Sequence, residues 1–307
     1  MPDIEARFNK DMLVLSAPLD TRLAREGIDV EHDREFVHLV EPKMLRDMYG
    51  LELVAGAQCL VTNTAGITRA RLSHVNMEER ASELAQAALD IAHLLKPQHI
   101  LAQIGSTELP LDATSAPSLR QNRDQYAQAA LSFGEGAFDA FFLNSMTNAL
   151  DMQCALMGIR KHSDKPIIAS LCLNEEGKLL GSLSDVGDAL AMMVEYGADV
   201  VGFEWSASLE KIVSLVEDVK EKVVVPLVVQ LAIKPQNPSQ QALRSQAPQQ
   251  QTQDSRETNP YSFPDTMIEA AARLRGAGVQ FLRASGDATP AYTAALVAAS
   301  SGFDVIA

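Results

Sequence analysis

The chain alternates between two kinds of segment: short, mostly apolar runs and longer stretches in which apolar residues recur every three or four positions. The short runs are typical of buried strands and the longer stretches of amphipathic helices. Strands are predicted at residues 12–16, 59–63, 99–104, 137–143, 166–173, 198–203 and 226–233, and an eighth begins at residue 279. Helices are predicted at 19–25, from 42 until Gly56, and at 77–95, 118–132, 149–160, 184–196, 206–222, 263–276 and 289–300, with residues 28–41 as a charged loop.

Eight strands that alternate with helices over 307 residues predict a single α/β domain, residues 1–307, folded as a closed (β/α)8 TIM-type barrel. The alternative is an open doubly wound sheet. That fold usually carries a glycine-rich phosphate loop after its first strand, whereas this chain has Ser16-Ala17-Pro18-Leu19-Asp20 there. The missing glycines favour the barrel.

Residues 236–260 interrupt the alternation. They are rich in Gln, Ser and Pro and contain almost no large apolar side chain. Such a segment cannot bury enough apolar surface to offset the entropy of ordering it. We therefore expect a mobile loop after the seventh strand.

Composition narrows the classes of partner. The formal net charge of −14 opposes binding to nucleic acid and to anionic membranes. Three cysteines without CxxC spacing form no disulfide framework, which favours a reducing cytoplasm. No apolar run approaches the ~20 residues needed to span a bilayer, and no HxxxH or HExxH spacing indicates a metal site.

Several short motifs follow one another in a familiar order. They are Ala55-Gly56-Ala57 with Val61-Thr62-Asn63-Thr64, Ile104-Gly105, Tyr126 with Asp139 and Met146, Gly197-Ala198-Asp199 with Val201-Gly202, and Gly278 with Thr289-Pro290. In this order and spacing the chain resembles the homocysteine S-methyltransferase family. The resemblance implies a (β/α)8 barrel, methyl transfer to a small molecule, and one-carbon metabolism.

The chain departs from the family pattern at positions that carry function. Ser16-Ala17 replaces the family's Asp-Gly after the first strand, and Asn144 replaces the Glu that holds the substrate amino group. Trp205, Ser285 and Gly286 replace the three cysteines that bind zinc in the family. Zinc there requires soft thiolate ligands. The resemblance therefore implies a divergent member that works without zinc, with a corrinoid methyl carrier as its cofactor system.

Loops after the strands form the active mouth of such a barrel. The candidate substrate-binding residues placed there are Ser16, Asp20, Asn63, Asn144, Trp205, Gln230, Ser285 and Asp287. The candidate catalytic residues are Glu204, as a general base beside an apolar neighbour, and Arg283, as a clamp for an anionic group. An ion pair between Glu204 and Arg283 would instead give both residues a structural role.

Three classes of function remain open at this stage. The first is a methyltransferase that acts on a small polar or anionic substrate, alongside a corrinoid protein or another methyltransferase subunit. The second is a non-catalytic binding or regulatory subunit that kept the barrel and lost the zinc chemistry. The third is an unrelated barrel lyase that uses Glu204 as its base.

Overall fold

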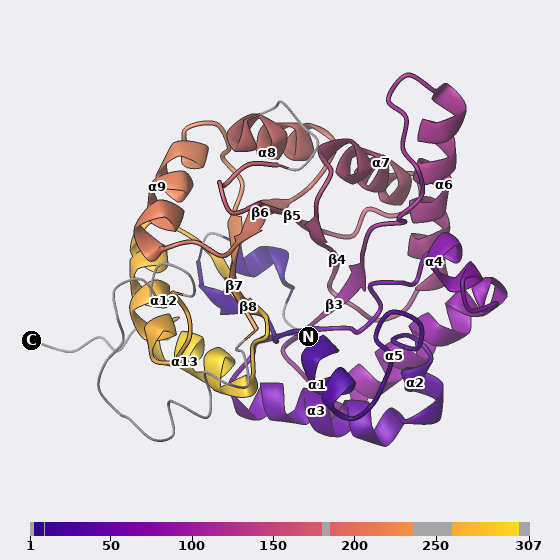
Figure 1. Cartoon of the computed structure of the whole chain (residues 1–307), viewed down its shortest axis with the longest axis horizontal. Helices are drawn as coiled ribbons and strands as arrows, with labels where there is room; N and C mark the ends of the chain where they lie inside the picture. Colours follow the sequence, from indigo (N-terminus) through magenta and orange to yellow (C-terminus); the bar gives the residue numbers. More distant parts are fainter. Residues whose placement is uncertain (1–2, 9, 180–184, 236–259, 301–307) are drawn as a thin grey trace, which may run out of the picture.

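The computed structural model describes residues 3–8, 10–179, 185–235 and 260–300. Its strands form one parallel sheet in the order β1-β8-β7-β6-β5-β4-β3-β2 (Figure 1). The strands are β1 Leu13–Val14, β2 Cys59–Val61, β3 His99–Ile104, β4 Ala140–Met146, β5 Ile167–Cys172, β6 Val200–Trp205, β7 Leu227–Ile233 and β8 Phe281–Gly286. A bridge between Leu15 and Cys59 joins the two ends of the sheet. The predicted (β/α)8 barrel is therefore confirmed.

The helices surround the strands as an outer ring (Figure 1). They are α1 Asp20–Arg25, α2 Val37–Val40, α3 Pro42–Val54, α4 Arg69–Ser73, α5 Ala81–Leu95, α6 Ala116–Ser132, α7 Ala149–Arg160, α8 Val186–Glu195, α9 Leu209–Lys220, α12 Thr266–Gly276 and α13 Pro290–Ser300. Short 3-10 turns occur at η1 Glu5–Arg7 and η2 Glu78–Arg80. Pro42 and Pro290 each occupy the first helical position, where the missing N–H costs no hydrogen bond.

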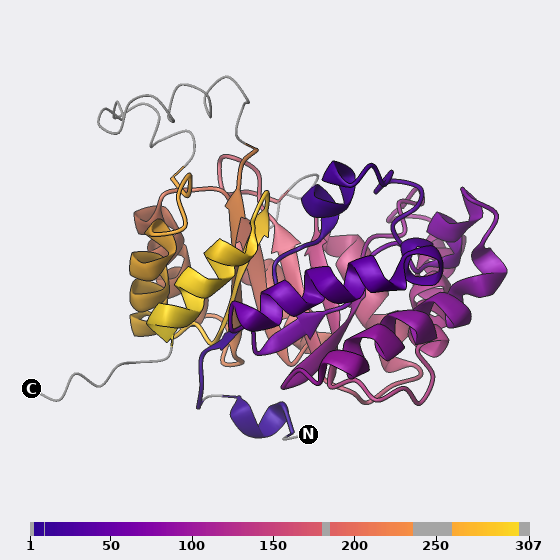
Figure 2. The same ribbon diagram turned by 90° about the horizontal axis from the view of Figure 1, so that it is seen from below.

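The core has two parts, because alternate residues of each strand face opposite sides of the sheet. Apolar residues such as Leu101, Phe142 and Val228 fill the barrel interior, and a larger shell lies between sheet and helices. Beneath the barrel, η1 lies at the end of the strands opposite α1 (Figure 2). Ile4 is buried there, and Phe8 packs edge-on against Phe281 at 5.7 Å. Apolar contacts of Ile4 and Phe8 thus help to close the lower end, where Arg7 also donates to Gln98 Oε1 at 2.7 Å.

The structure differs from the sequence predictions in a few segments. The predicted loop 28–41 contains the short helix α2, and α4 forms where none was predicted. Strand β4 begins at Ala140 rather than at residue 137, and Asp139 just before it accepts the Ile100 N–H with its carboxylate at 2.8 Å. The predicted mobile loop 236–260 lies, except for its last residue, outside the described residues.

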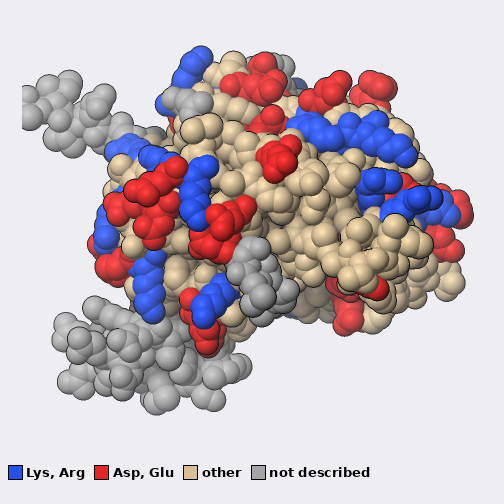
Figure 3. Space-filling model, turned by 90° about the horizontal axis from the view of Figure 1, so that it is seen from above, with Lys and Arg blue, Asp and Glu red and all other residues tan. Residues whose placement is uncertain are grey.

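Acidic and basic side chains are interspersed over the face seen in Figure 3. The described residues include exposed ion pairs, such as Arg80 with Glu83 and Lys222 with Asp185. Exposed pairs of this kind contribute little to stability. Across the ranges the structure covers, none of the helices has the length and apolar character needed to cross a bilayer.

His38 in α2 makes stability depend on pH. Its ring is buried, Nδ1 donates to the Glu35 carbonyl at 2.8 Å, and Nε2 has no partner among the described residues. Burial lowers the pKa of His38 from 6.5 to about 4. Since the unfolded chain binds the proton at higher pH, we expect up to about 3 kcal/mol of stability, fully present above pH 6.5, to be lost as the pH falls towards 4.

The measurement is chemical denaturation of wild type and His38→Asn between pH 4 and 7.5. Asparagine keeps a donor for the Glu35 carbonyl but does not titrate. The comparison with wild type removes the opposing effect of Glu35, whose pKa burial raises. Identical pH slopes for the two proteins would show that His38 does not titrate in this way.

Candidate functional site

The polar residues at the carboxyl ends of the strands line two adjoining cavities. A small inner pocket of about 10 Å³ is lined by Ala17, Pro18, Leu19, Asp20, Arg34, Val61, Thr62, Asn63, Ala65, Gln103 and Arg283. An outer cavity of about 380 Å³ is lined by Pro18, Asp20, Thr21, Asn144, Glu204, Pro235, Ser285, Gly286 and Asp287. Pro18 and Asp20 line both, so the two cavities adjoin, and together they are called the mouth. Its position is that of active sites in barrels of this fold.

Arg283 on β8 is the largest fully buried side chain of the molecule as described. Its Nε donates to the Ser16 carbonyl at 2.9 Å and Nη1 donates to Gln230 Oε1 at 3.2 Å. Its guanidinium also lies 5.3 Å from the centre of the Phe142 ring. Burial lowers the pKa of Arg283 to about 10, while nearby carboxylates such as Glu204 act in the opposite direction. The group therefore stays charged at neutral pH.

No carboxylate lies within ion-pair distance of Arg283 in the described part of the chain. The Glu204–Arg283 ion pair, which the sequence left open as a structural role, is not formed there. A buried cation is costly unless an anion or several hydrogen bonds stabilise it. Arg283 has five N–H donors and uses two of them on neutral oxygens. It lines the inner pocket, and its other N–H donors have no protein acceptor among the described residues.

Gln230 on β7 connects Arg283 to the end of β4. Its side chain is fully buried, and Nε2, which has two hydrogens to donate, lies 2.9 Å from Asn144 Oδ1, 3.0 Å from Ser145 Oγ and 2.6 Å from Ser170 Oγ. Ser170 Oγ also accepts the Ser145 N–H. Buried hydrogen-bond networks of this kind hold side chains in a defined orientation.

Glu204 on β6 lies on another side of the mouth. Its Oε1 accepts a hydrogen bond from Ser285 Oγ at 2.7 Å, and the residue is half-buried. Cys172 is its register partner on β5, and burial together with the Glu204 charge raises the pKa of that thiol to about 11. Within the described residues Glu204 has no cationic partner at ion-pair distance, so its carboxylate is available to a ligand.

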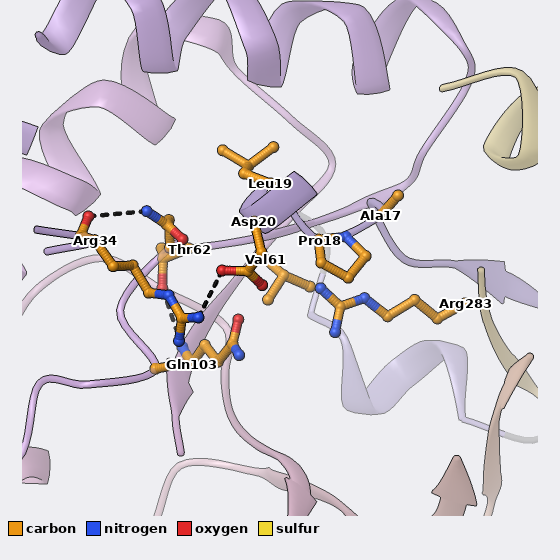
Figure 4. A pocket seen from close by; sticks show the side chains of 11 residues that line it. Ala17, Pro18, Leu19, Asp20, Arg34, Val61, Thr62, Gln103 and Arg283 are labelled. Carbon is orange, nitrogen blue, oxygen red and sulfur yellow. Dashed lines mark hydrogen bonds and ion pairs between the residues drawn. The ribbon is translucent and has the colours of Figure 1, made fainter. Parts of the chain in front are cut away.

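The other carboxylates of the mouth are already paired. Asp20 Oδ1 lies 2.7 Å from Arg34 Nη2, and Asp287 lies 3.3 Å from the exposed Arg25. In Figure 4, Arg34 and Arg283 approach the inner pocket from opposite sides, with Asp20 between them. Glu204 and Arg283 are therefore the two mouth charges that lack a salt bridge among the described residues.

Ser16 and Asn63 are buried and contribute through both their backbone and their side chains. Ser16 offers its carbonyl to Arg283, while its hydroxyl accepts the Val61 N–H at 3.0 Å and so links β1 to β2. The Asn63 N–H donates to the Tyr49 hydroxyl, and its amide donates to the Arg34 carbonyl at 3.0 Å. Both residues hold other groups of the mouth in position.

Trp205 lies apart from the remaining candidates. Its side chain belongs to the apolar shell outside the strands and packs on Gly177, where a Cβ would come within 2.6 Å of the indole. Two residues of the site were missed by sequence reasoning. Ser170 could have been found as the inward-facing polar residue of β5, two positions after Ile168, whereas no periodicity marks Arg34 in its irregular loop.

Comparison with known proteins assigns the class to which this mouth belongs. A family model described as homocysteine S-methyltransferase matches residues 13–298. Methionine synthase of Mycobacterium tuberculosis is 26% identical over 188 residues, which cover 56% of this chain and 15% of that protein. Methionine synthase of Mycobacterium leprae is 26% identical over 187 residues, again with 56% and 15% covered. The chain thus spans only a small part of the curated relatives it matches.

The solved structures agree on the fold. The homocysteine methyltransferase MmuM from Escherichia coli has a TM-score of 0.73 in its oxidised form at 14% identity, and of 0.73 in its metallated form at 16% identity. Each alignment covers 94% of this chain and 96% of the other. At this identity the likeness concerns the barrel alone. On the family match, the chain belongs to the homocysteine S-methyltransferase family.

The residues at the expected zinc positions do not fit a thiolate-bound zinc. Trp205 offers no ligand, and Ser285 directs its hydroxyl to Glu204. Gly286 has φ +63°, and a Cβ there would lie 2.4 Å from the Ile233 carbonyl oxygen, so a side chain is excluded on steric grounds. Among the described residues no three His, Cys, Asp or Glu side chains are grouped to hold a metal ion.

Proposed function

We propose that this chain catalyses methyl transfer on a small substrate that carries an anionic group, without a thiolate-bound zinc. Family membership supports methyl transfer as the reaction class. The observation that carries the proposal is Arg283, a buried guanidinium without a carboxylate partner in the described structure, which opens on the mouth. Binding of a substrate anion would supply the missing countercharge.

Glu204 is the proposed proton acceptor. In the step, a lone pair of the acceptor atom forms the bond to the methyl carbon, and the bond from that carbon to its donor breaks with its electrons left on the donor. The proton of the acceptor passes to the Glu204 carboxylate, which Ser285 holds in place. A general base at this point performs the activation that zinc performs in relatives with three cysteines. The methyl carrier in this proposal is a corrinoid protein.

The test is a transfer assay with methylcobalamin labelled with ¹³C in its methyl group and a pool of small metabolites as acceptors. With wild type we expect a new ¹³C-methyl signal by NMR, and we expect homocysteine in the pool to receive no labelled methyl group. With Glu204→Gln the rate should fall about 10²–10⁴-fold, as is typical for removal of a general base. Wild-type protein that binds oxyanions but transfers no methyl group would leave a non-catalytic binding subunit as the function.

Zinc content gives an independent prediction. Purified protein should contain far less than one zinc per chain by metal analysis, and treatment with a chelator should leave its methyl transfer unchanged. The reason is that Trp205, Ser285 and Gly286 supply none of the three thiolates that such a site needs. About one zinc per chain that survives dialysis would contradict this prediction.

A further inference from the structure

We propose that Asn144 presents its amide N–H groups to the outer cavity, so that the group bound beside Asn144 is a hydrogen-bond-accepting oxyanion rather than an ammonium group. Asn144 is thereby assigned as a residue that determines specificity. The inference deepens the proposed function, because it takes the mouth as the ligand site and specifies the chemistry of one end of it.

The argument begins at Arg283, because a guanidinium can only donate hydrogen bonds. The Gln230 atom 3.2 Å from Arg283 Nη1 must therefore be the amide oxygen. This contact fixes the orientation of the Gln230 amide, which is otherwise ambiguous between its oxygen and its nitrogen. The Gln230 NH2 group must then point away from Arg283, towards the end of β4.

The orientation of the Gln230 amide in turn fixes the orientation of the Asn144 amide. Since Gln230 Nε2 is a donor, the Asn144 atom 2.9 Å away must be the amide oxygen Oδ1. Ser145 Oγ donates to this same oxygen at 3.0 Å. Both contacts lie on the protein side, so the Asn144 NH2 group occupies the other side of the amide. In the described part of the chain it meets no protein acceptor, and Asn144 lines the outer cavity.

The backbone at the end of β4 holds this arrangement in place. Ser145 has φ +51°, in the left-handed region that residues with a side chain seldom adopt, and the pairing register of β4 with β5 shifts between Leu143 and Met146. Ser170 Oγ accepts the Ser145 N–H at 2.9 Å and stabilises this conformation. Local strain of this kind is characteristic of functional sites. It fixes Asn144 against Gln230 before any ligand arrives.

Two donors thus flank one buried amide. The unused N–H groups of Arg283 lie on its oxygen side, and the Asn144 NH2 group lies beyond its nitrogen side. A carboxylate or a phosphate in the outer cavity can accept from the Asn144 NH2 group, whereas an ammonium group would meet only N–H donors there.

The test uses acetate and inorganic phosphate as oxyanion probes and ethylammonium as a cationic probe, titrated into the full chain and followed by NMR. In wild type we expect both oxyanions to shift the Asn144 side-chain NH2 signals, which are identified by their absence in Asn144→Asp. The ratio of the two affinities then distinguishes a carboxylate ligand from a phosphate ligand. Ethylammonium should leave these signals unmoved.

Two variants make the test quantitative. Asn144→Asp is nearly isosteric but replaces the NH2 donor with a charged oxygen, and we expect it to weaken oxyanion binding by more than tenfold. Asn144→Ala removes the donor without adding charge and should weaken binding by about tenfold. Asn148→Asp is the matched control, because Asn148 caps α7 through its oxygen and keeps that role as an aspartate.

The outcomes separate this inference from the proposed function. Oxyanion affinity unchanged in both Asn144 variants, or wild-type NH2 signals that respond to ethylammonium alone, would overturn the inference. An equal loss in Asn148→Asp would show that added charge, rather than the lost donor, weakens binding, and would overturn it as well. Oxyanion binding through Asn144 without methyl transfer would leave the inference standing and refute the proposed function.

Discussion

Replacing Arg283 with methionine is expected to weaken the binding of acetate or phosphate by about a hundredfold while the protein keeps nearly its full stability. Two charge-assisted hydrogen bonds to a bound oxyanion correspond to about 3 kcal/mol, which is that change in Kd. No other cation of the mouth replaces Arg283, because Arg34 and Arg25 are already paired with Asp20 and Asp287. Binding would be measured by NMR titration or calorimetry.

The expected stability follows from two opposing effects. The pKa of Arg283, lowered from 12.5 to about 10 by burial, indicates that its charge costs about 3 kcal/mol in the folded state at neutral pH. Methionine fills much of the same space above Phe142 without this cost, but leaves the Ser16 carbonyl and the buried Gln230 Oε1 without their donor, at about 1–3 kcal/mol each. No carboxylate is left unpaired at ion-pair distance, so the net change in unfolding free energy should be small.

Arg25→Met is the matched control, since Arg25 lies at the edge of the same mouth and is half-exposed. Loss of this screened charge should change oxyanion affinity only slightly. An Arg283→Met protein that loses 3 kcal/mol or more of stability but binds oxyanions as wild type does would assign Arg283 a structural role. In that case the non-catalytic barrel would become the better account of the chain.

The sequence predicted the barrel because its strands and helices bury enough apolar residues to leave a clear periodicity. β3 and α7 were predicted with the bounds that the structure has. The short helices α2 and α4 were missed because four or five residues are too few to show a helical repeat. The start of β4 was placed too early because Phe138 is apolar and buried, yet belongs to the aromatic cluster outside the strand.

The sequence predicted where the site lies, but not which of its side chains contact one another. Since strand ends converge at one end of a barrel, residues distant in sequence, such as Asn144, Gln230 and Arg283, were expected near one another. Gln230 rather than Glu204 lies against Arg283, because β7 pairs directly with β8 and Gln230 is the register partner of Arg283, whereas Glu204 is one strand further away. The register between neighbouring strands and the strained turn at Ser145 leave no pattern in the chain, so the sequence did not reveal these contacts.

Glu52 is expected to have the largest effect on stability. Its carboxylate is fully buried in α3 and accepts hydrogen bonds from Arg22 at 2.7 Å, from the Ala17 N–H at 3.0 Å and from the Thr293 hydroxyl at 2.7 Å. It therefore joins α1, α3 and α13 to the loop after β1. Glu52→Ala would leave these donors without their acceptor and Arg22 without its countercharge, at about 3–5 kcal/mol.

The loss should be visible as a lower denaturation midpoint with an unchanged m value. Glu52→Gln keeps the shape and an acceptor but removes the charge, so it should lose less. Asp47→Ala on the exposed face of the same helix is the control and should change stability by no more than about 0.5 kcal/mol. If Glu52→Ala were as mild as Asp47→Ala, the three hydrogen bonds would not be made in solution.

Replacing Glu52 should also weaken oxyanion binding in the mouth. Ala17 and the residues that follow it, up to Asp20, line the inner pocket beside Arg283, and the Ala17 N–H is held in place by the Glu52 carboxylate. Where Glu52→Gln remains folded, we expect its oxyanion affinity to fall as well, because this wall of the pocket loses its anchor. A variant with reduced stability and wild-type affinity would show that the loop after β1 is positioned by β1 and α1 alone.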